Sequence, residues 1–374
     1  MRATTTYAIC TGMCVFAPSQ AFVRPVSLPS IAIEVMHDVY AAPVGERRSA
    51  SLGARGGGRS GLRMGLGSSA KNAWRRVRGG GKSDRSDAEL KEGIAGFYDK
   101  SSGIWEEMWG EHMHHGYYVQ GNKPKTIEDH KAAQRFMVGR SLEWAGVQEG
   151  ASAPKTGVDI GCGIGGSSRQ ICRRFGTKMT GITLSPVQRE RAQAISEEAG
   201  LGDKCTFQVA DALDTPFESG SFDLVWSMES GEHMPHKQKF VGELARICAP
   251  GGRVLVVTWC HRDLEDGETE LTPNEEKLLQ RINKAYYLPR WCSTADYVKY
   301  FEAEGLVDVQ RADWTDNIQS FWPAVIRSSL SLQGILGLLR SGPVTIRGAV
   351  AMLLMVRGYR KNLVKFALIT ARKP

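Results

Sequence analysis

The stretch VDIGCGIGG, residues 158–166, joins an apolar run that ends in an acidic residue to a turn with four glycines. A helical pattern follows, so the sequence predicts a strand, a tight turn and a helix in that order. Glycine tolerates the backbone angles of such a turn, and its missing side chain lets the main chain approach a ligand closely. A loop of this kind can hold a dinucleotide or S-adenosylmethionine.

The next two expected strands favour one of these ligands. A dinucleotide-binding fold usually carries an acidic residue about 20 residues further on, at the tip of its second strand, where it holds the ribose. The second expected strand, residues 179–184, has no acid at its tip, but Thr183 and Gln188 offer hydrogen bonds to ribose hydroxyls. The third, residues 205–210, runs into Asp211 and Ala212, which suit an adenine amino group and a ring nitrogen. These features favour S-adenosylmethionine.

The order of the remaining elements resembles the class I S-adenosylmethionine-dependent methyltransferase fold. A fourth strand, residues 222–226, runs into SMESGEH (227–233), and a helix that ends near Pro250 leads into an apolar strand, residues 253–259. The resemblance implies a Rossmann-like α/β fold with a seven-stranded, mostly parallel sheet whose last strand is antiparallel. It also implies a helical N-terminal cap and a C-terminal helical lid insertion. The alternative is a nucleotide-binding module without chemistry.

The net charge of +8 belongs to the N-terminal leader. Residues 1–88 hold 13 Lys and Arg against 5 Asp and Glu, whereas the rest of the chain holds 35 of each. The body has no basic patch interleaved with aromatic residues, so nucleic acid is not an expected partner. None of the six cysteines of the body forms a C-x-x-C pair, and this pattern fits a reducing compartment.

Residues 1–88 are Gly- and Arg-rich, poor in acids and without a periodic apolar pattern, as expected of a disordered targeting leader. They resemble the bipartite presequence of algae with complex plastids, which implies a signal peptide over about 1–21 and a transit peptide over about 22–88. Cleavage is expected between Ala21 and Phe22. A mitochondrial or simple plastid leader, or a disordered tail, is the alternative.

The methyltransferase domain is expected over residues 89–374. It divides into the N-terminal cap (89–150), the adenosylmethionine-binding core (151–318), the lid insertion (319–362) and the last strand (363–374). In the insertion, residues 330–339 and 349–356 are too short to span a membrane, and their flanking arginines suggest amphipathic helices. They are expected to cover the core, and an exposed apolar edge would allow peripheral contact with a membrane.

Three motifs carry a closer resemblance: HMHHG (112–116), WSMESGEHMP (226–235) and TWCHR (258–262). With the glycine turn, they are similar to the gamma-tocopherol C-methyltransferase family of plastid vitamin E synthesis, over about residues 94–374. The resemblance implies S-adenosylmethionine-dependent methylation of the chromanol ring, from gamma- to alpha-tocopherol and from delta- to beta-tocopherol. Its partner would be a lipophilic chromanol, and its location a plastid envelope or thylakoid surface.

Cofactor contacts are expected from the glycine turn and from the tips of the next three strands. The residues are Asp159, Gly161, Cys162, Gly163, Gly165, Thr183, Gln188, Asp211, Ala212 and Ser227. An aromatic face from Tyr98 or Trp105 would favour the positive sulfonium.

Carbon methylation beside a phenol needs a group that accepts the phenol proton. Glu229 and His233 follow the fourth strand, at the sheet edge where open α/β sheets bind ligands, and His115 comes from the N-terminal cap. These three are the expected catalytic residues, and Tyr117 is a further candidate. The nearby histidines could instead hold a metal, but carbon methylation requires no Lewis acid, so no metal is expected.

Several related functions share these motifs. A benzoquinol methyltransferase, a small-molecule N-methyltransferase and a non-catalytic adenosylmethionine-binding protein that shields a lipid are the alternatives. The sequence does not determine the oligomeric state.

Overall fold

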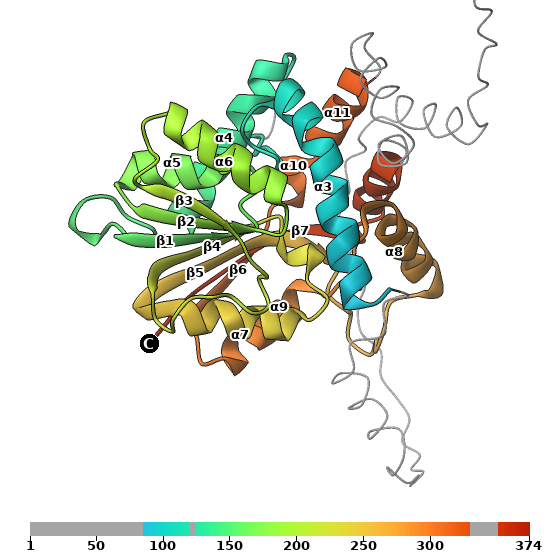
Figure 1. Cartoon of the computed structure of the whole chain (residues 1–374). Coiled ribbons are helices and arrows are strands. Elements are labelled where there is room, and N and C mark those ends of the chain that lie inside the picture. Colours follow the sequence, from blue (N-terminus) through green and yellow to red (C-terminus); the bar gives the residue numbers. More distant parts are fainter. Residues whose placement is uncertain (1–84, 120–123, 330–350) are drawn as a thin grey trace, which may run out of the picture. The chain divides into compact units, whose positions relative to one another are not determined.

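The computed structural model describes residues 85–119, 124–329 and 351–374 (Figure 1). The strands are β1 (Thr156–Ile160), β2 (Lys178–Thr183), β3 (Cys205–Val209), β4 (Phe222–Met228), β5 (Cys248–His261), β6 (Val307–Asp313) and β7 (Val364–Arg372). The α-helices are α3 (Asp87–Trp109), α4 (Ile127–Trp144), α5 (Gly166–Phe175), α6 (Pro186–Glu198), α7 (Lys237–Ile247), α8 (Pro273–Tyr286), α9 (Thr294–Ala303), α10 (Thr315–Ile318) and α11 (Phe321–Ser329). Short 3₁₀ turns cover Gly150–Ser152 and Gly231–His233, and residues 351–360 are helical.

The strands form one sheet in the order β3-β2-β1-β4-β5-β7-β6. The strands β3, β2, β1, β4 and β5 are parallel, and β7 lies antiparallel between β5 and β6. The predicted class I methyltransferase fold, with its seven strands and its antiparallel last strand, is therefore confirmed. The order reverses beside β1, which places a ligand crevice at the carboxyl ends of β1 and β4.

Helices cover both faces of the sheet, which explains why its central strands are apolar on both sides (Figure 1). In β4, Leu224 and Trp226 join the core under α4 and α5, whereas Val225 joins the core under α7 and α9. All three side chains are fully buried. This alternation fixes the register of the strand, because a shift by one residue would exchange the two faces.

Local signals set the beginnings of several helices. Ser86 caps α3 and Thr126 caps α4, each in a capping box with an acidic residue three positions later. Helix α4 lies within the expected N-terminal cap. Helix α3 begins two residues before the expected domain boundary at 89 and continues to Trp109.

Two predicted regions lie largely outside the described residues. They are the leader, of which only residues 85–88 are described, and the middle of the lid insertion, residues 330–350. The two ends of the insertion are described, as α11 and the helix over 351–360, and the last strand begins at Val364. No helix within the described ranges has both the length and the apolar character needed to cross a bilayer.

Candidate active site

A pocket opens at the carboxyl ends of the parallel strands, between the sheet and α3. It holds about 1150 Å³ of empty space, its mouth included. Its walls come from α3, from the 111–114 loop, from the glycine turn after β1, from the tips of β2 and β3 and from the turn after β4. The predicted cofactor residues that line it are Asp159, Gly161, Cys162, Gly163, Thr183, Gln188, Asp211 and Ala212.

The glycine turn is fixed by steric contacts. Gly161 has a φ of 79°, and a Cβ added there would lie 2.3 Å from the Cβ of Ser230. The backbone N–H groups of Gly161 and Cys162 both donate to the carbonyl oxygen of Ile182 at 2.9 Å, which ties the turn to β2. Any side chain at position 161 would therefore displace the floor of the pocket.

Asp159 lies just before this turn, at the end of β1, and is 2% exposed. Its carboxylate accepts a 2.6 Å hydrogen bond from Ser168 Oγ at the start of α5. Burial raises the pKa of Asp159 to about 7, although the bond from Ser168 opposes the rise. The carboxyl group thus joins β1 to α5 while facing the pocket.

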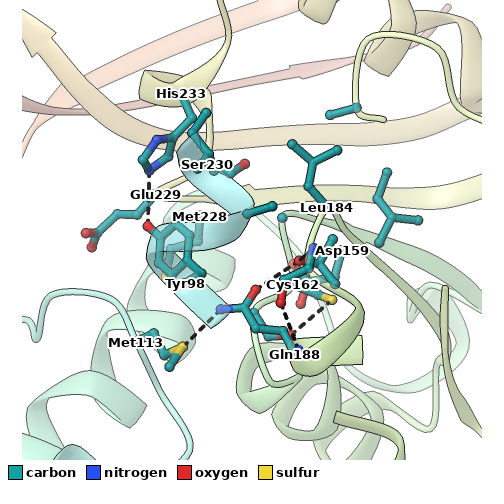
Figure 2. Close-up of a pocket in the computed structure, with 18 of the residues that line it drawn as sticks. Tyr98, Met113, Asp159, Cys162, Leu184, Gln188, Met228, Glu229, Ser230 and His233 are labelled. Atoms are coloured by element: carbon teal, nitrogen blue, oxygen red, sulfur yellow. Dashed lines mark hydrogen bonds between the residues drawn. The ribbon is translucent and has the colours of Figure 1, made fainter. Parts of the chain in front are cut away.

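At the next two strand tips, the polar side chains are already engaged with the protein. Thr183 Oγ1 donates to Gln188 Oε1 at 2.9 Å, and Gln188 Nε2 lies 3.6 Å from Met113 Sδ (Figure 2). Asp211 forms a 2.6 Å ion pair with Lys91 of α3 and accepts a hydrogen bond from the backbone of Leu213. The ion pair joins the cap helix to the rim of the pocket.

Two predicted cofactor residues do not line the pocket. Gly165 has a φ of 80°, and its missing side chain makes room for Phe207, whose ring would lie 2.6 Å from an added Cβ. Ser227 is fully buried, and its hydroxyl pairs with that of Ser230 at 2.7 Å. Ser230 Oγ donates in turn to the carbonyl oxygen of Ile160, so this pair joins β4 to β1 beneath the pocket.

The predicted catalytic residues Glu229 and His115 are in direct contact. The backbone N–H of His115 donates to Glu229 Oε1 at 2.6 Å, and Nδ1 of its ring lies 2.7 Å from Oε2. Glu229 also has a φ of 51°, which is uncommon for a residue with a side chain and is typical of strain held at functional sites. Glu229 lines the pocket, whereas His115 lies behind it and is 2% exposed.

His233, the third predicted catalytic residue, lines the pocket opposite Tyr98. Tyr98 Oη lies 3.1 Å from His233 Nε2, and the two side chains point toward one another in Figure 2. Burial, and to a smaller extent Lys237, lowers the pKa of His233 to about 3. Burial also raises the pKa of Tyr98, with smaller contributions from Glu232 and Glu229. Tyr98 therefore keeps its proton and donates the hydrogen bond to His233 Nε2. Because the His233 ring is neutral and Nε2 accepts, the single ring proton lies on Nδ1.

A second carboxyl group lies close to Glu229. Glu232 is 2% exposed and accepts a 2.8 Å hydrogen bond from Thr258 Oγ1. Burial, followed by the charge of Glu229, raises the pKa of Glu232 to about 8. Near neutrality, Glu232 therefore carries a proton, which makes it a poor base beside Glu229.

The other histidines and Tyr117 are held in different ways. His112 Nδ1 lies 3.1 Å from His114 Nε2, and His236 pairs with Asp87 at the surface. Across the described ranges, no three side chains of the metal-binding types gather in a metal-binding arrangement. Tyr117 packs its ring against Phe136 and Trp314 rather than lining the pocket. The side chain of Trp105 falls outside the described part of the chain.

Sequence reasoning missed Arg169, which supports the glycine turn from below. Its side chain is completely buried and donates to the carbonyl oxygen of Ile164 at 2.8 Å and to Glu111 Oε2 at 2.8 Å. It thereby joins the turn to the 111–118 loop. An arginine in an otherwise amphipathic helix gives no sign that it is buried, so no sequence signal could have identified it.

The pocket fits S-adenosylmethionine. Its floor is a turn whose missing side chains allow close approach of a ligand, its rim carries Asp211, and the ring of Tyr98 faces it. These groups are consistent with the predicted cofactor, S-adenosylmethionine.

Comparison with known proteins agrees with this geometry. A family profile described as "Methyltransferase domain" matches residues 158–256. A rice (Oryza sativa subsp. japonica) protein named "Probable tocopherol O-methyltransferase, chloroplastic" is 58% identical over 286 residues, which cover 76% of this chain and 79% of the relative. The Arabidopsis thaliana "Tocopherol O-methyltransferase, chloroplastic" is 53% identical over 292 residues, 77% of this chain and 84% of the relative.

More distant proteins share the fold. The "Norajmaline N-methyltransferase" of Rauvolfia serpentina is 36% identical over 76% of this chain and 99% of the relative. The crystal structure of a geranyl diphosphate C-methyltransferase from Streptomyces coelicolor A3(2) matches with a TM-score of 0.60 at 22% identity, over 78% of this chain and all of that one. The likeness to the Streptomyces structure concerns the fold alone.

The predicted enzyme class, cofactor and family are thus confirmed by the match over most of both chains, together with the sheet order and the glycine turn. The chain belongs to the tocopherol methyltransferase family of S-adenosylmethionine-dependent methyltransferases.

Proposed function

We propose that this enzyme methylates the chromanol ring of tocopherols at the carbon beside the phenol, converting gamma- to alpha-tocopherol and delta- to beta-tocopherol. The observation that carries the proposal is the contact of His115 with Glu229, which lines the pocket that fits the methyl donor. This contact supports a proton acceptor beside the acceptor ring of the substrate. The names of the rice and Arabidopsis relatives support tocopherol as the substrate.

The residues of the chain activate the ring. A free phenol has a pKa of about 10, so its oxygen donates little electron density near neutrality. A hydrogen bond to, or proton transfer toward, the Glu229–His115 pair increases the electron density of the neighbouring ring carbon. Bound S-adenosylmethionine supplies an electrophilic methyl group, so beyond activating the ring the protein needs to align it with the donor and exclude water.

The relatives carry the name O-methyltransferase, whereas the proposal is transfer to carbon. The difference follows from the chemistry of the products: alpha-tocopherol keeps the phenol of gamma-tocopherol and gains a ring methyl. Transfer to oxygen would instead consume the phenol. In our proposal the phenol oxygen is held by the Glu229–His115 pair, which turns the adjacent carbon toward the donor.

Methyl transfer to three acceptors tests the proposal. The full-length chain is incubated with labelled S-adenosylmethionine and gamma-tocopherol, a prenylated benzoquinol or a small amine. Label is expected in gamma-tocopherol, in a product that has lost an aromatic proton and kept its phenol proton, as NMR distinguishes. Label only in the benzoquinol, only in the amine or in an O-methyl group rejects the proposal. The amine is included because the Rauvolfia N-methyltransferase is 36% identical.

We also propose that the enzyme works in a plastid, at the surface of the envelope or thylakoid. The relatives named chloroplastic and the basic leader support this location. Residues 1–88 would be the leader, residues 89–374 the catalytic domain, and cleavage before Phe22 the first processing step. Protein purified from the source cells is expected to begin at or after Phe22, and a chain that still begins at Met1 would argue against import.

A further inference from the structure

Buried polar atoms without a hydrogen-bond partner gather on one side of Glu229. Within the described residues ten buried side-chain atoms lack a partner. Four of them belong to His115, the partner of Glu229, and to side chains of the core cluster beside it, namely His115 Nε2, Trp259 Nε1, Trp322 Nε1 and Tyr359 Oη. An unsatisfied buried polar atom costs about 1–3 kcal/mol, so such a cluster indicates that a ligand completes it.

The side chains in this cluster are in mutual contact. The His115 ring lies 5.1 Å from Trp322 and 5.7 Å from Trp259, and the two indoles lie 6.2 Å apart, all measured between centroids. Tyr286 closes the group at 6.3 Å from Trp259 and 6.5 Å from Trp322. We name these residues, with Tyr359, the aromatic chamber.

Tyr359 belongs to the chamber although it comes from the last helix. Tyr359 packs in the same core cluster as Trp259 and Trp322. Burial, and then the charge of Glu229, raise its pKa well above the usual value for tyrosine. The indole N–H of Trp322 interacts with the Tyr359 hydroxyl and opposes the rise, although the contact falls short of a well-formed hydrogen bond. His115 is 2% exposed, Trp322 5%, and Trp259 and Tyr359 9% each.

The hydrogen-bonding capacities of the unpartnered atoms are complementary to a particular kind of ligand. Because His115 Nδ1 faces the Glu229 carboxylate, its proton lies there and Nε2 remains an acceptor. The indoles of Trp259 and Trp322 can only donate, and the Tyr359 hydroxyl can donate or accept. The chamber therefore offers one acceptor nitrogen and at least two donors, enclosed by apolar rings.

We propose that the aromatic chamber is the binding site for the head group of the methyl acceptor, a phenol ring that carries a second ring oxygen. The phenol O–H donates to His115 Nε2, and the indole N–H groups donate to the ring oxygens. The inference rests on the proposed function for the choice of ligand. It adds Trp259, which lies in the TWCHR motif, and Trp322 and Tyr359, which no sequence motif identifies, as specificity-determining residues.

The same argument predicts discrimination against amines. An ammonium group has donors only, so it would leave both indole N–H groups unpaired, and a neutral tertiary amine has no proton for His115 Nε2. A site built to hydrogen-bond an oxygen rejects a ligand that lacks it, because its own buried polar groups then stay unsatisfied. In the structure the rings pack on one another, so at least one must rotate when a head group enters.

Binding without methyl transfer tests the inference. The full-length chain, without methyl donor, is titrated with a tail-less chromanol that has the gamma-tocopherol methyl pattern, and with its phenol methyl ether. Tryptophan fluorescence and calorimetry measure the affinity. The chromanol is expected to change the fluorescence and to bind at least about 10-fold more tightly than the ether. His115→Ala, Trp322→Phe and Tyr359→Phe should each weaken chromanol binding by about 10-fold.

Matched control variants separate a specific loss of chromanol binding from a loss of folding. Tyr118→Phe removes a buried hydroxyl that already has a partner in His130, and Trp144→Phe removes an indole that contacts Trp314. Both should keep the affinity of the unmodified chain, and thermal unfolding should show all variants folded. Chromanol affinity that is unchanged in all three chamber variants overturns the inference, even if gamma-tocopherol is methylated. Binding that depends on the chamber, with transfer only to another acceptor, supports the inference and overturns the proposed function.

Discussion

The side chain of Glu229 accepts two hydrogen bonds from His115, a residue 114 positions earlier in the chain, at 2.6 and 2.7 Å. Both carboxylate oxygens are thereby occupied, one by the backbone N–H and one by the ring. Glu229 thus orients His115 rather than offering a free oxygen itself, an arrangement in which a carboxylate sets the tautomer of a histidine base.

Replacement of Glu229 by glutamine should reduce turnover and leave cofactor affinity within about twofold. Glutamine keeps the shape, but its amide nitrogen cannot accept the proton on His115 Nδ1. We expect kcat to fall by about 100-fold or more. Calorimetry with S-adenosylmethionine and steady-state rates with gamma-tocopherol measure the two effects.

Glu243→Gln is the control for this change, because Glu243 is a largely buried carboxylate paired with Arg246 outside the pocket. The Glu243→Gln change should lower the free energy of unfolding and leave kcat unchanged. A Glu229→Gln enzyme that lost cofactor affinity but kept its kcat would disprove the assigned role.

Gly161→Ala should abolish cofactor binding, because its Cβ would lie 2.3 Å from Ser230 on the pocket floor. We expect a stability loss of about 2–4 kcal/mol, from overpacking and from the left-handed backbone. Gly176→Ala is the matched control: its φ is 73°, but an added Cβ there meets nothing within 4 Å. It should cost only about 1 kcal/mol and keep the cofactor affinity. Urea unfolding and calorimetry compare the two, and equal cofactor affinity in both variants would contradict the steric argument.

Arg169→Met should loosen the glycine turn. The change leaves the Ile164 carbonyl without its donor and removes the partner of Glu111, which is itself half exposed. We expect a loss of about 2–4 kcal/mol in unfolding free energy and weaker S-adenosylmethionine binding. Arg174→Met, which breaks more exposed ion pairs at the end of the same helix, should cost less than about 1 kcal/mol. If the two variants unfold at the same urea concentration, Arg169 does not support the turn.

Stability of the cofactor-free enzyme should fall as the pH rises from about 4 to 7, in part because of Asp159. Burial raises its pKa to about 7, above the 3.8 of the free group, so the folded state binds the extra proton between these values. Stability therefore decreases with pH across this window and levels off above it. Asp159→Asn keeps an acceptor for Ser168 and removes the titration.

The variant should gain stability relative to the unmodified chain between pH 5 and pH 8, by at most about 3 kcal/mol. Urea unfolding at both pH values measures this difference. A gap between the two proteins that stays constant with pH would show that Asp159 is ionised throughout.

The sheet and the pocket floor could be predicted from the sequence because their signals are local. Strand periodicity, the capping boxes at Ser86 and Thr126 and the positive φ of Gly161 each depend on a few neighbouring residues. The order of such elements then restricts the topology, because parallel strands need crossover connections and sequential elements tend to be neighbours.

Other features arise only when distant parts of the chain meet. The glycine at 165 makes room for Phe207, and Ser227 faces Ser230 rather than the pocket. Neither role can be distinguished from ligand contact in the sequence, because the same residue type serves both.

The sequence by itself determined the class of fold, the methyl donor and the edge of the sheet where the chemistry takes place. Tertiary structure decided that His115 would meet Glu229, that Arg169 would be buried and that Trp322 and Tyr359 would join Trp259. These contacts join residues far apart in the chain, and their geometry depends on how whole helices and strands pack together. A local pattern records the backbone that a residue prefers, but not the distant side chain that it will touch.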